Sequence, residues 1–181
     1  VLDDKGRGFA PAEGPKESWL LLVGEALGDV EAAVGRPFLG DAGGMLTRLL
    51  NMLGWQRDAI RIHNAISCQP PGNWFDERAP WYHGALAHCP YLEQTLREHP
   101  RVVVPMGQAA LKRVLHLEHK RKIKVQDFHG AILRDPSDSY FVVPTYHPSF
   151  LQRGATNLIG TVLWDLKRAE EETLRLASFP R

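Results

Sequence analysis

Short apolar runs alternate with longer amphipathic stretches along this chain, and this alternation restricts its fold more than any other feature of the sequence. Residues 20–23 form the first apolar run, which breaks into glycines and carboxylates over residues 24–31. Residues 42–53 then space apolar side chains three and four positions apart, as an amphipathic helix does. Repeated units of this kind build a parallel sheet with helices on both faces.

The same pattern continues to the end of the chain. Three further strands are expected over residues 60–66, 102–104 and 140–143, and three further helices over residues 85–98, 107–115 and 157–176. The 181 residues are enough to bury one substantial core, so we expect residues 1–181 to form a single domain.

Composition leaves the function open. The formal net charge of +1 argues neither for nor against a nucleic-acid partner, because a polyanion responds to the local distribution of cations. Only two cysteines occur, which is too few for a disulfide scaffold and indicates a cytoplasmic protein. No apolar run is long enough to cross a bilayer, so no membrane partner is expected. Because the first residue is Val1, we expect further residues upstream.

Reactive side chains follow three of the expected strands. Glu25 and Glu31 come after the first, Asn64 lies in the second, and His147 follows the fourth. Taken singly, the carboxylates suit a helix N-terminus or solvent, and the histidine suits a structural role. Asn64 is more suggestive, since an amide among apolar residues needs partners for its donor and its acceptor. Parallel strands would bring all four residues to one edge of the sheet, which favours a functional site.

Four motifs resemble, in the correct order, the signatures of the uracil-DNA glycosylase superfamily, nearest its family 4, thermophile-type members. The motifs are Gly24-Glu25-Ala26-Leu27-Gly28, Gly35-Arg36-Pro37-Phe38, the stretch from Asn64 through Cys68 to Asn73, and Tyr146-His147-Pro148-Ser149. The likeness covers residues 8 to 168. It implies an α/β fold, a three-layer α/β/α sandwich with a central four-stranded parallel sheet. It also implies a DNA repair glycosylase that hydrolyses the N-glycosidic bond of uracil in DNA and leaves an abasic site.

The resemblance assigns roles that suit the residue types. Phe38 would stack on a base flipped out of the DNA. Asn64 would pair with the uracil edge, whose donor and acceptor cytosine reverses. His147 would donate a hydrogen bond to uracil O2 as negative charge develops there. Glu25 would position the attacking water and favour the positively charged sugar.

Other parts of the pocket and the DNA surface follow from the same resemblance. Glu31 is either a pocket wall that excludes the thymine methyl group or a carboxylate at a helix N-terminus. The backbone at Ala26 and Gly28 would let the chain approach the base closely. The expected contacts to DNA are Gln69, Asn73 and Ser149 to phosphates, with Phe150, Leu151 and Arg153 on the loop after His147. Phe150 and Leu151 are either wedges in the duplex or parts of the core. The basic run at residues 119–124 is either a DNA contact or solvated surface.

Two departures from the family pattern affect the expected chemistry. Leu27 stands where a proline is usual, which would loosen the first turn and alter the water geometry. Family 4 members hold a 4Fe-4S cluster on four cysteines, and Cys68 and Cys89 match two of them. The other pair would fall just before Val1. The alternative is that these two cysteines are buried free thiols.

The resemblance implies a monomeric uracil-DNA glycosylase acting on single- or double-stranded uracil-containing DNA, and two other functions remain open. One is a non-catalytic, replication-associated DNA-binding module on the same fold. A third interpretation is a glycosylase for another deaminated base such as hypoxanthine or xanthine. Activity on uracil-containing DNA separates the first from the second, and competition among modified oligonucleotides separates it from the third.

Overall fold

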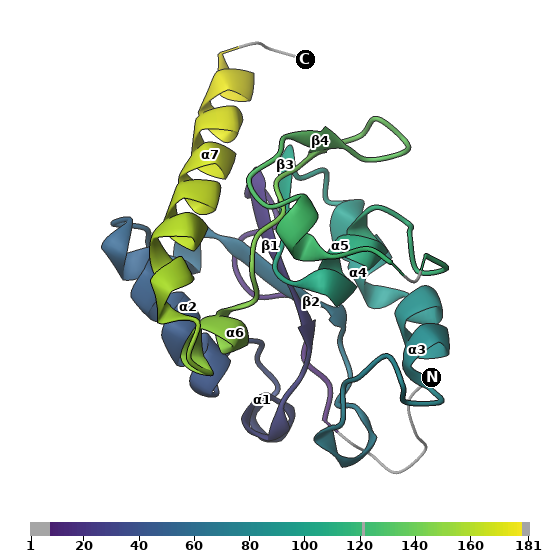
Figure 1. Ribbon diagram of the computed structural model, residues 1–181. Coiled ribbons are helices and arrows are strands. Elements are labelled where there is room, and N and C mark those ends of the chain that lie inside the picture. Colours follow the sequence, from purple (N-terminus) through teal and green to yellow (C-terminus); the bar gives the residue numbers. More distant parts are fainter. Residues whose placement is uncertain (1–7, 121, 179–181) are drawn as a thin grey trace.

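A twisted, mostly parallel sheet forms the centre of the molecule (Figure 1). The computed structural model describes residues 8–120 and 122–178, and within them five strands form one sheet in the order β2-β1-β3-β5-β4. The strands are β1 (Leu20–Ala26), β2 (Arg61–Ile66), β3 (Val102–Pro105), β4 (Leu133–Arg134) and β5 (Phe141–Val142). The four expected strands run parallel to one another, and β4 pairs antiparallel with β5 at the edge. The predicted α/β fold is confirmed, with β4 as an additional strand.

Helices cover both faces of the sheet (Figure 1). They are α1 (Asp29–Val34), α2 (Asp41–Met52), α3 (Tyr82–His88), α4 (Tyr91–Leu96), α5 (Gln108–Val114), α6 (Pro148–Gln152) and α7 (Ile159–Ala177). Leu21 and Val23 of β1 face a core shared with α3, α4 and α5, whereas Leu20 and Leu22 face a core shared with α2, α6 and α7. Because β1 is buried on both faces, its sequence is a continuous apolar run, as expected for a central parallel strand.

Two elements differ from the sequence prediction. The helix expected over residues 85–98 is broken into α3 and α4 at Cys89, whose backbone is extended at φ −67° and ψ 114°. The following residue is Pro90, and a proline disfavours the helical conformation in the residue before it. The fourth expected strand shortens to the two residues of β5, and β4 was missed because two residues carry no readable period.

The sheet brings the expected strand ends together at one edge. In the parallel register of β1 and β2, Gly24 pairs with Asn64, and on the other side Val23 pairs with Pro105 of β3. Backbone after β5 continues the parallel direction, with Thr145 bridged to Met106. None of the described helices combines the length and the apolar composition that crossing a bilayer requires.

Candidate active site

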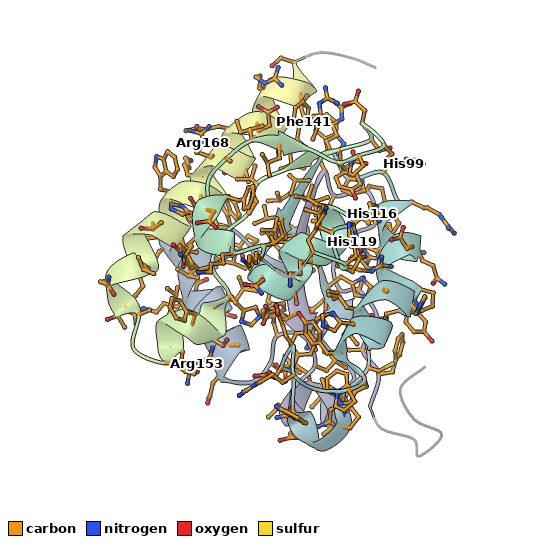
Figure 2. The ribbon with its side chains drawn as sticks, turned by 45° about the vertical axis from the view of Figure 1, so that its right-hand side comes forward. His99, His116, His119, Phe141, Arg153 and Arg168 are labelled. Atoms are coloured by element: carbon orange, nitrogen blue, oxygen red, sulfur yellow. The ribbon has the colours of Figure 1, made fainter. Side chains whose placement is uncertain are left out.

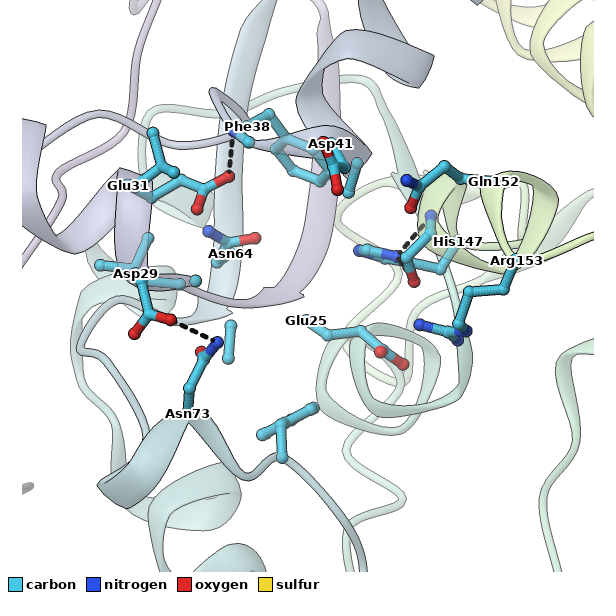
Figure 3. A pocket seen from close by; sticks show the side chains of 18 residues that line it. Glu25, Asp29, Glu31, Phe38, Asp41, Asn64, Asn73, His147, Gln152 and Arg153 are labelled. Carbon is cyan, nitrogen blue, oxygen red and sulfur yellow. Dashed lines mark hydrogen bonds between the residues drawn. The ribbon is translucent and has the colours of Figure 1, made fainter.

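A pocket of about 540 Å³ opens at the carboxyl edge of the parallel strands (Figure 3). It is lined by the end of β1, the α1 segment, the start of α2, β2 and the loop that carries His147. Figure 3 shows Phe38, Asn64, Glu25 and His147 approaching it from different sides. The predicted site residues that line it are Glu25, Ala26, Gly28, Glu31, Phe38, Asn64, Asn73, His147, Ser149 and Arg153. The pocket also includes Phe75 and Gln152, which the sequence analysis did not single out.

The Phe38 and Asn64 side chains both pack against Gly24 of β1, in the space that a side chain at this position would occupy. A Cβ atom at Gly24 would lie 2.3 Å from Asn64 Oδ1 and 2.3 Å from Phe38 Cζ. Both side chains belong to buried residues, yet both line the pocket. Among the described residues no group hydrogen-bonds the Asn64 amide, so its donor and its acceptor are available to a ligand.

The backbone at Phe38 is held in an unusual conformation from both sides. Its φ is +55°, in the left-handed region that a bulky residue rarely adopts. Before it, the Arg57 guanidinium donates to the Pro37 carbonyl at 2.7 Å. After it, Glu31 Oε1 accepts from the amides of the next two residues at 3.0 and 2.9 Å. Glu31 is therefore both a pocket wall and an anchor of the Phe38 loop, and Arg57 is an anchor that the sequence analysis missed.

His147 is held as a neutral donor. Its Nδ1 accepts from the backbone N–H of Ser149 at 3.2 Å, which places the ring proton on Nε2, and the Ser149 hydroxyl lies 2.8 Å from the same Nδ1. Burial lowers the pKa of His147, although the carboxylates of Glu25 and Glu31 oppose that shift. The ring stacks near Phe38, with 5.7 Å between centroids, and its second nitrogen turns toward the pocket (Figure 3).

Glu25 lies beside His147 because Gly107 leaves room for both. Gly107 has φ +92°, and a Cβ atom there would lie 2.6 Å from Glu25 Oε1 and 3.0 Å from His147 Cβ. The same Glu25 oxygen accepts from the Ala109 amide at 3.2 Å, at the start of α5. A carboxylate held next to an imidazole donor at an open pocket is suited to orienting water.

A buried acid behind this edge anchors the segment that leads to His147. Asp165 on α7 accepts from the Thr145 hydroxyl at 2.7 Å and lies 3.2 Å from His129 Nδ1. Asp165 and Thr145 are fully buried, and burial raises the pKa of Asp165 while its two partners oppose the shift. The sequence analysis missed this group. Its position on the apolar face of α7, three residues after Val162, is the signal that identifies it.

Several expected DNA contacts make bonds within the protein. The Gln69 and Asn73 side-chain amides both donate to Asp29 on α1, and Ser149 is bonded to His147. These bonds leave their role toward phosphates a prediction.

Phe150 and Leu151, the two apolar candidates on the loop after His147, lie in different environments. Leu151 is fully buried in the core, whereas Phe150 is exposed and stacks on Tyr146 at 5.9 Å. Of the two, only Phe150 is free to contact DNA without unfolding the core.

Two further expectations concern the surroundings of the pocket. Leu27 lines the pocket wall and is almost fully buried, and its effect on the first turn and on the water geometry stays a prediction. The basic run begins at His119, which lies on the α5 side of the molecule, well separated from Arg153 (Figure 2). Arg121 lies outside the described residues. None of the described residues of the run lines the pocket, and its contact with DNA stays a prediction.

Cys68 and Cys89 are neighbours with free thiols. Burial raises the pKa of Cys68, and the charge of Cys89 adds to the rise. Phe9 pairs antiparallel with Cys68, so the first described residues lie beside it. Two thiolates are half of those that a four-cysteine cluster needs, and among the described residues no three potential metal ligands gather. The residues of this chain do not by themselves form a 4Fe-4S site.

Comparison with known proteins agrees with this geometry. Residues 11–173 match the profile of the uracil DNA glycosylase superfamily. A type-4 uracil-DNA glycosylase of Thermotoga maritima is 33% identical over 162 residues, covering 87% of this chain and 79% of the relative. A type-4 uracil-DNA glycosylase of Pyrobaculum aerophilum is 34% identical over 146 residues, covering 79% and 72% respectively. The chain belongs to the uracil-DNA glycosylase superfamily.

Proposed function

We propose that this protein is a DNA repair enzyme that hydrolyses the N-glycosidic bond of uracil in DNA and leaves an abasic site. The observation that carries the proposal is the convergence of the Phe38 ring, the Asn64 amide and the His147 imidazole on one pocket. The names of the relatives favour uracil over hypoxanthine and xanthine, and favour an enzyme over a non-catalytic module.

Recognition of uracil rests on a ring platform and one amide. Extruding a base from the DNA stack costs a few kcal/mol. The Phe38 ring offers the extruded base a flat apolar surface on which it can stack. The Asn64 oxygen accepts from uracil N3–H and its nitrogen donates to O4. Cytosine presents an acceptor at N3 and a donor at C4, so the same amide orientation rejects it.

Bond cleavage uses His147 and Glu25 in different ways. As the bond between the sugar C1′ and uracil N1 breaks, its electron pair stays on uracil, and the Nε2–H of His147 stabilises the charge at O2. Water held by Glu25 adds to C1′ and loses a proton, while the leaving uracil finally gains one. The lowered pKa of His147 keeps it a neutral donor at physiological pH.

Several finer points belong to the same proposal. We expect a monomer that accepts uracil in single- or double-stranded DNA and acts in the cytoplasm. The free thiols of Cys68 and Cys89 support a reducing location. Contacts from Gln69, Asn73, Ser149, Phe150 and Arg153 would hold the DNA strand. Cys68 and Cys89 would serve a cluster only together with thiolates that this chain does not contain.

Uracil release from an oligonucleotide tests the proposal. The wild-type chain should convert uracil-containing DNA to abasic product, and His147→Ala should lower the single-turnover rate about 10²- to 10³-fold, as loss of a donor to a developing oxyanion does. His99→Ala is the matched control, because His99 is exposed and lies far from Arg153 (Figure 2). A folded wild-type protein inactive on both single- and double-stranded uracil DNA would refute the proposal.

A further inference from the structure

Trp74 is a large aromatic side chain that the fold leaves uncovered beside the pocket. It is 48% exposed, and its two chain neighbours, Asn73 and Phe75, both line the pocket. The loop that carries it follows β2 and lies beside α1 at the lower end of Figure 1. Trp74 therefore lies on the rim of the site without filling it.

The loop is held on both sides of this residue. On one side Asn73 donates to Asp29 at 3.2 Å, and the Trp74 amide donates to the Pro71 carbonyl at 3.2 Å. On the other side the Phe75 ring packs on Tyr82, with 5.0 Å between centroids. The indole therefore projects from fixed backbone, and little backbone entropy remains to be lost when a partner binds.

The charged side chains of the loop are paired within the protein. Residues 71–80 contain one cation, Arg78, and two acids, Asp76 and Glu77. Arg78 is bound by Asp76 through two bonds of 2.7 and 2.8 Å, and Glu77 pairs with Lys112 at 2.8 Å. Because Arg78 is already paired, residues 71–80 offer no unpaired cation to a phosphate, whereas the uncharged face of a base can still stack on the Trp74 indole.

We propose that Trp74 stacks on an unpaired base that neighbours the excised nucleotide in the same strand, and so extends the DNA-binding surface beyond the pocket. The inference rests on the proposed function. Base–aromatic stacking is tolerant of sequence and is worth about 1–3 kcal/mol per base by alanine substitution, which is about a 5- to 150-fold change in affinity.

Binding of a single-stranded oligonucleotide with a tetrahydrofuran abasic-site analogue, followed by fluorescence anisotropy at several salt concentrations, tests this inference. Trp74→Ala should weaken binding about 5- to 150-fold without changing the dependence of affinity on salt, because stacking releases no counterions. Trp74→Phe should restore most of the affinity. Arg153→Ala should instead reduce the salt slope by about 0.7, as loss of one phosphate contact to a single strand does.

A second oligonucleotide ties the effect to a base. If both bases flanking the analogue are also replaced by tetrahydrofuran, wild type should fall to the affinity of Trp74→Ala, and the variant should lose nothing more. Trp19→Ala is the matched control, because this tryptophan, 36% exposed, stacks on Arg101 at the opposite edge of the sheet. It should bind both oligonucleotides like wild type.

Three results would overturn the inference. They are unchanged binding by folded Trp74→Ala, a salt slope that changes with Trp74, and an equal loss on DNA that lacks the flanking bases. Uracil release by the wild-type chain separates this failure from failure of the proposed function. If wild type releases uracil, the glycosylase proposal stands whatever Trp74 does.

Discussion

A methyl group added at Gly24 would collide with two side chains that line the pocket. The Cβ of an alanine would lie 2.3 Å from Asn64 Oδ1 and from Phe38 Cζ, distances that require both side chains to move. Asn64 belongs to the neighbouring strand, and Phe38 is fixed by bonds on either side of it. Neither side chain can therefore move readily to make room for the methyl group.

We expect Gly24→Ala to lower the uracil-release rate about 10²-fold or more, since a misplacement of 1 Å in a binding site costs about that much. Gly44→Ala is the matched control. Gly44 lies in the interior of α2, is exposed, and has no atom within 4 Å of the place a methyl group would take, so its replacement should stabilise the helix by up to about 1 kcal/mol. Single-turnover assays with thermal unfolding of both variants make the comparison. A fully active Gly24→Ala variant would mean that uracil release does not depend on the present positions of the Asn64 and Phe38 side chains.

Helix α7 supports the loop of His147 through one buried carboxylate, Asp165. Asp165 bonds Thr145, two residues before His147, and also contacts His129. The Tyr146 ring lies between His129 and Phe150, with centroid distances of 5.3 and 5.9 Å. The long helix thus sets the path of the segment on which the proposed catalytic histidine is carried.

We expect Asp165→Ala to lower the free energy of unfolding by about 1–3 kcal/mol, because the Thr145 hydroxyl is left buried without its acceptor. It should also slow uracil release at temperatures well below its unfolding midpoint. Asp165→Asn keeps a carbonyl acceptor for Thr145 and should recover most of both properties. Urea unfolding and single-turnover rates measure the two effects. An Asp165→Ala protein that is less stable but fully active when folded would show that Asp165 serves the scaffold alone.

Strands and helices could be predicted from the sequence where the spacing of apolar residues stays regular over the whole element. The strands at β1, β2 and β3 are continuous or alternating apolar runs, and the helices at α2 and α7 repeat their apolar residues over several turns. The split of α3 from α4 depends on one proline, whose local effect the longer apolar pattern concealed. β4 exists only because β5 offers it an edge, which is a tertiary reason that no local pattern contains.

Protonation of the buried His63 imidazole makes the free energy of unfolding depend on pH. It is buried in β2 with Nε2 at 2.8 Å from the Ser67 hydroxyl, and burial, with a smaller contribution from Arg61, lowers its pKa from 6.5 to about 4. Between these values the unfolded chain binds a proton that the folded chain does not. Stability must therefore fall as pH decreases through this range.

We expect the free energy of unfolding to decrease from pH 6.5 to pH 4, with His63 contributing at most about 1.4 kcal/mol per pH unit. His63→Gln should flatten that decrease, whatever its effect on stability at pH 7. Urea unfolding of both proteins across this pH range gives the difference, which cancels the titration of other histidines. Parallel curves would mean that His63 does not titrate as its burial requires.

The site as a whole was predictable in outline because parallel strands must deliver their carboxyl ends to one edge. That rule brings Glu25, Asn64 and His147 together from the sequence alone. It could not find Arg57, which reaches Pro37 from 20 residues away in the sequence, or the Gln69 and Asn73 bonds to Asp29. Those contacts depend on how loops lie over the edge, and loop paths follow from packing and not from periodicity.

The left-handed backbone of Phe38 has a consequence for the timing of order in this molecule. Such a conformation persists only where its surroundings over-determine it, and here hydrogen bonds from Arg57 and to Glu31, all within the protein, do so. The freedom of the ring is therefore lost once, when the chain folds, and is not lost again each time a base arrives. A base that enters the pocket would therefore stack on a ring already in place, and its affinity would carry no entropic cost for ordering that ring.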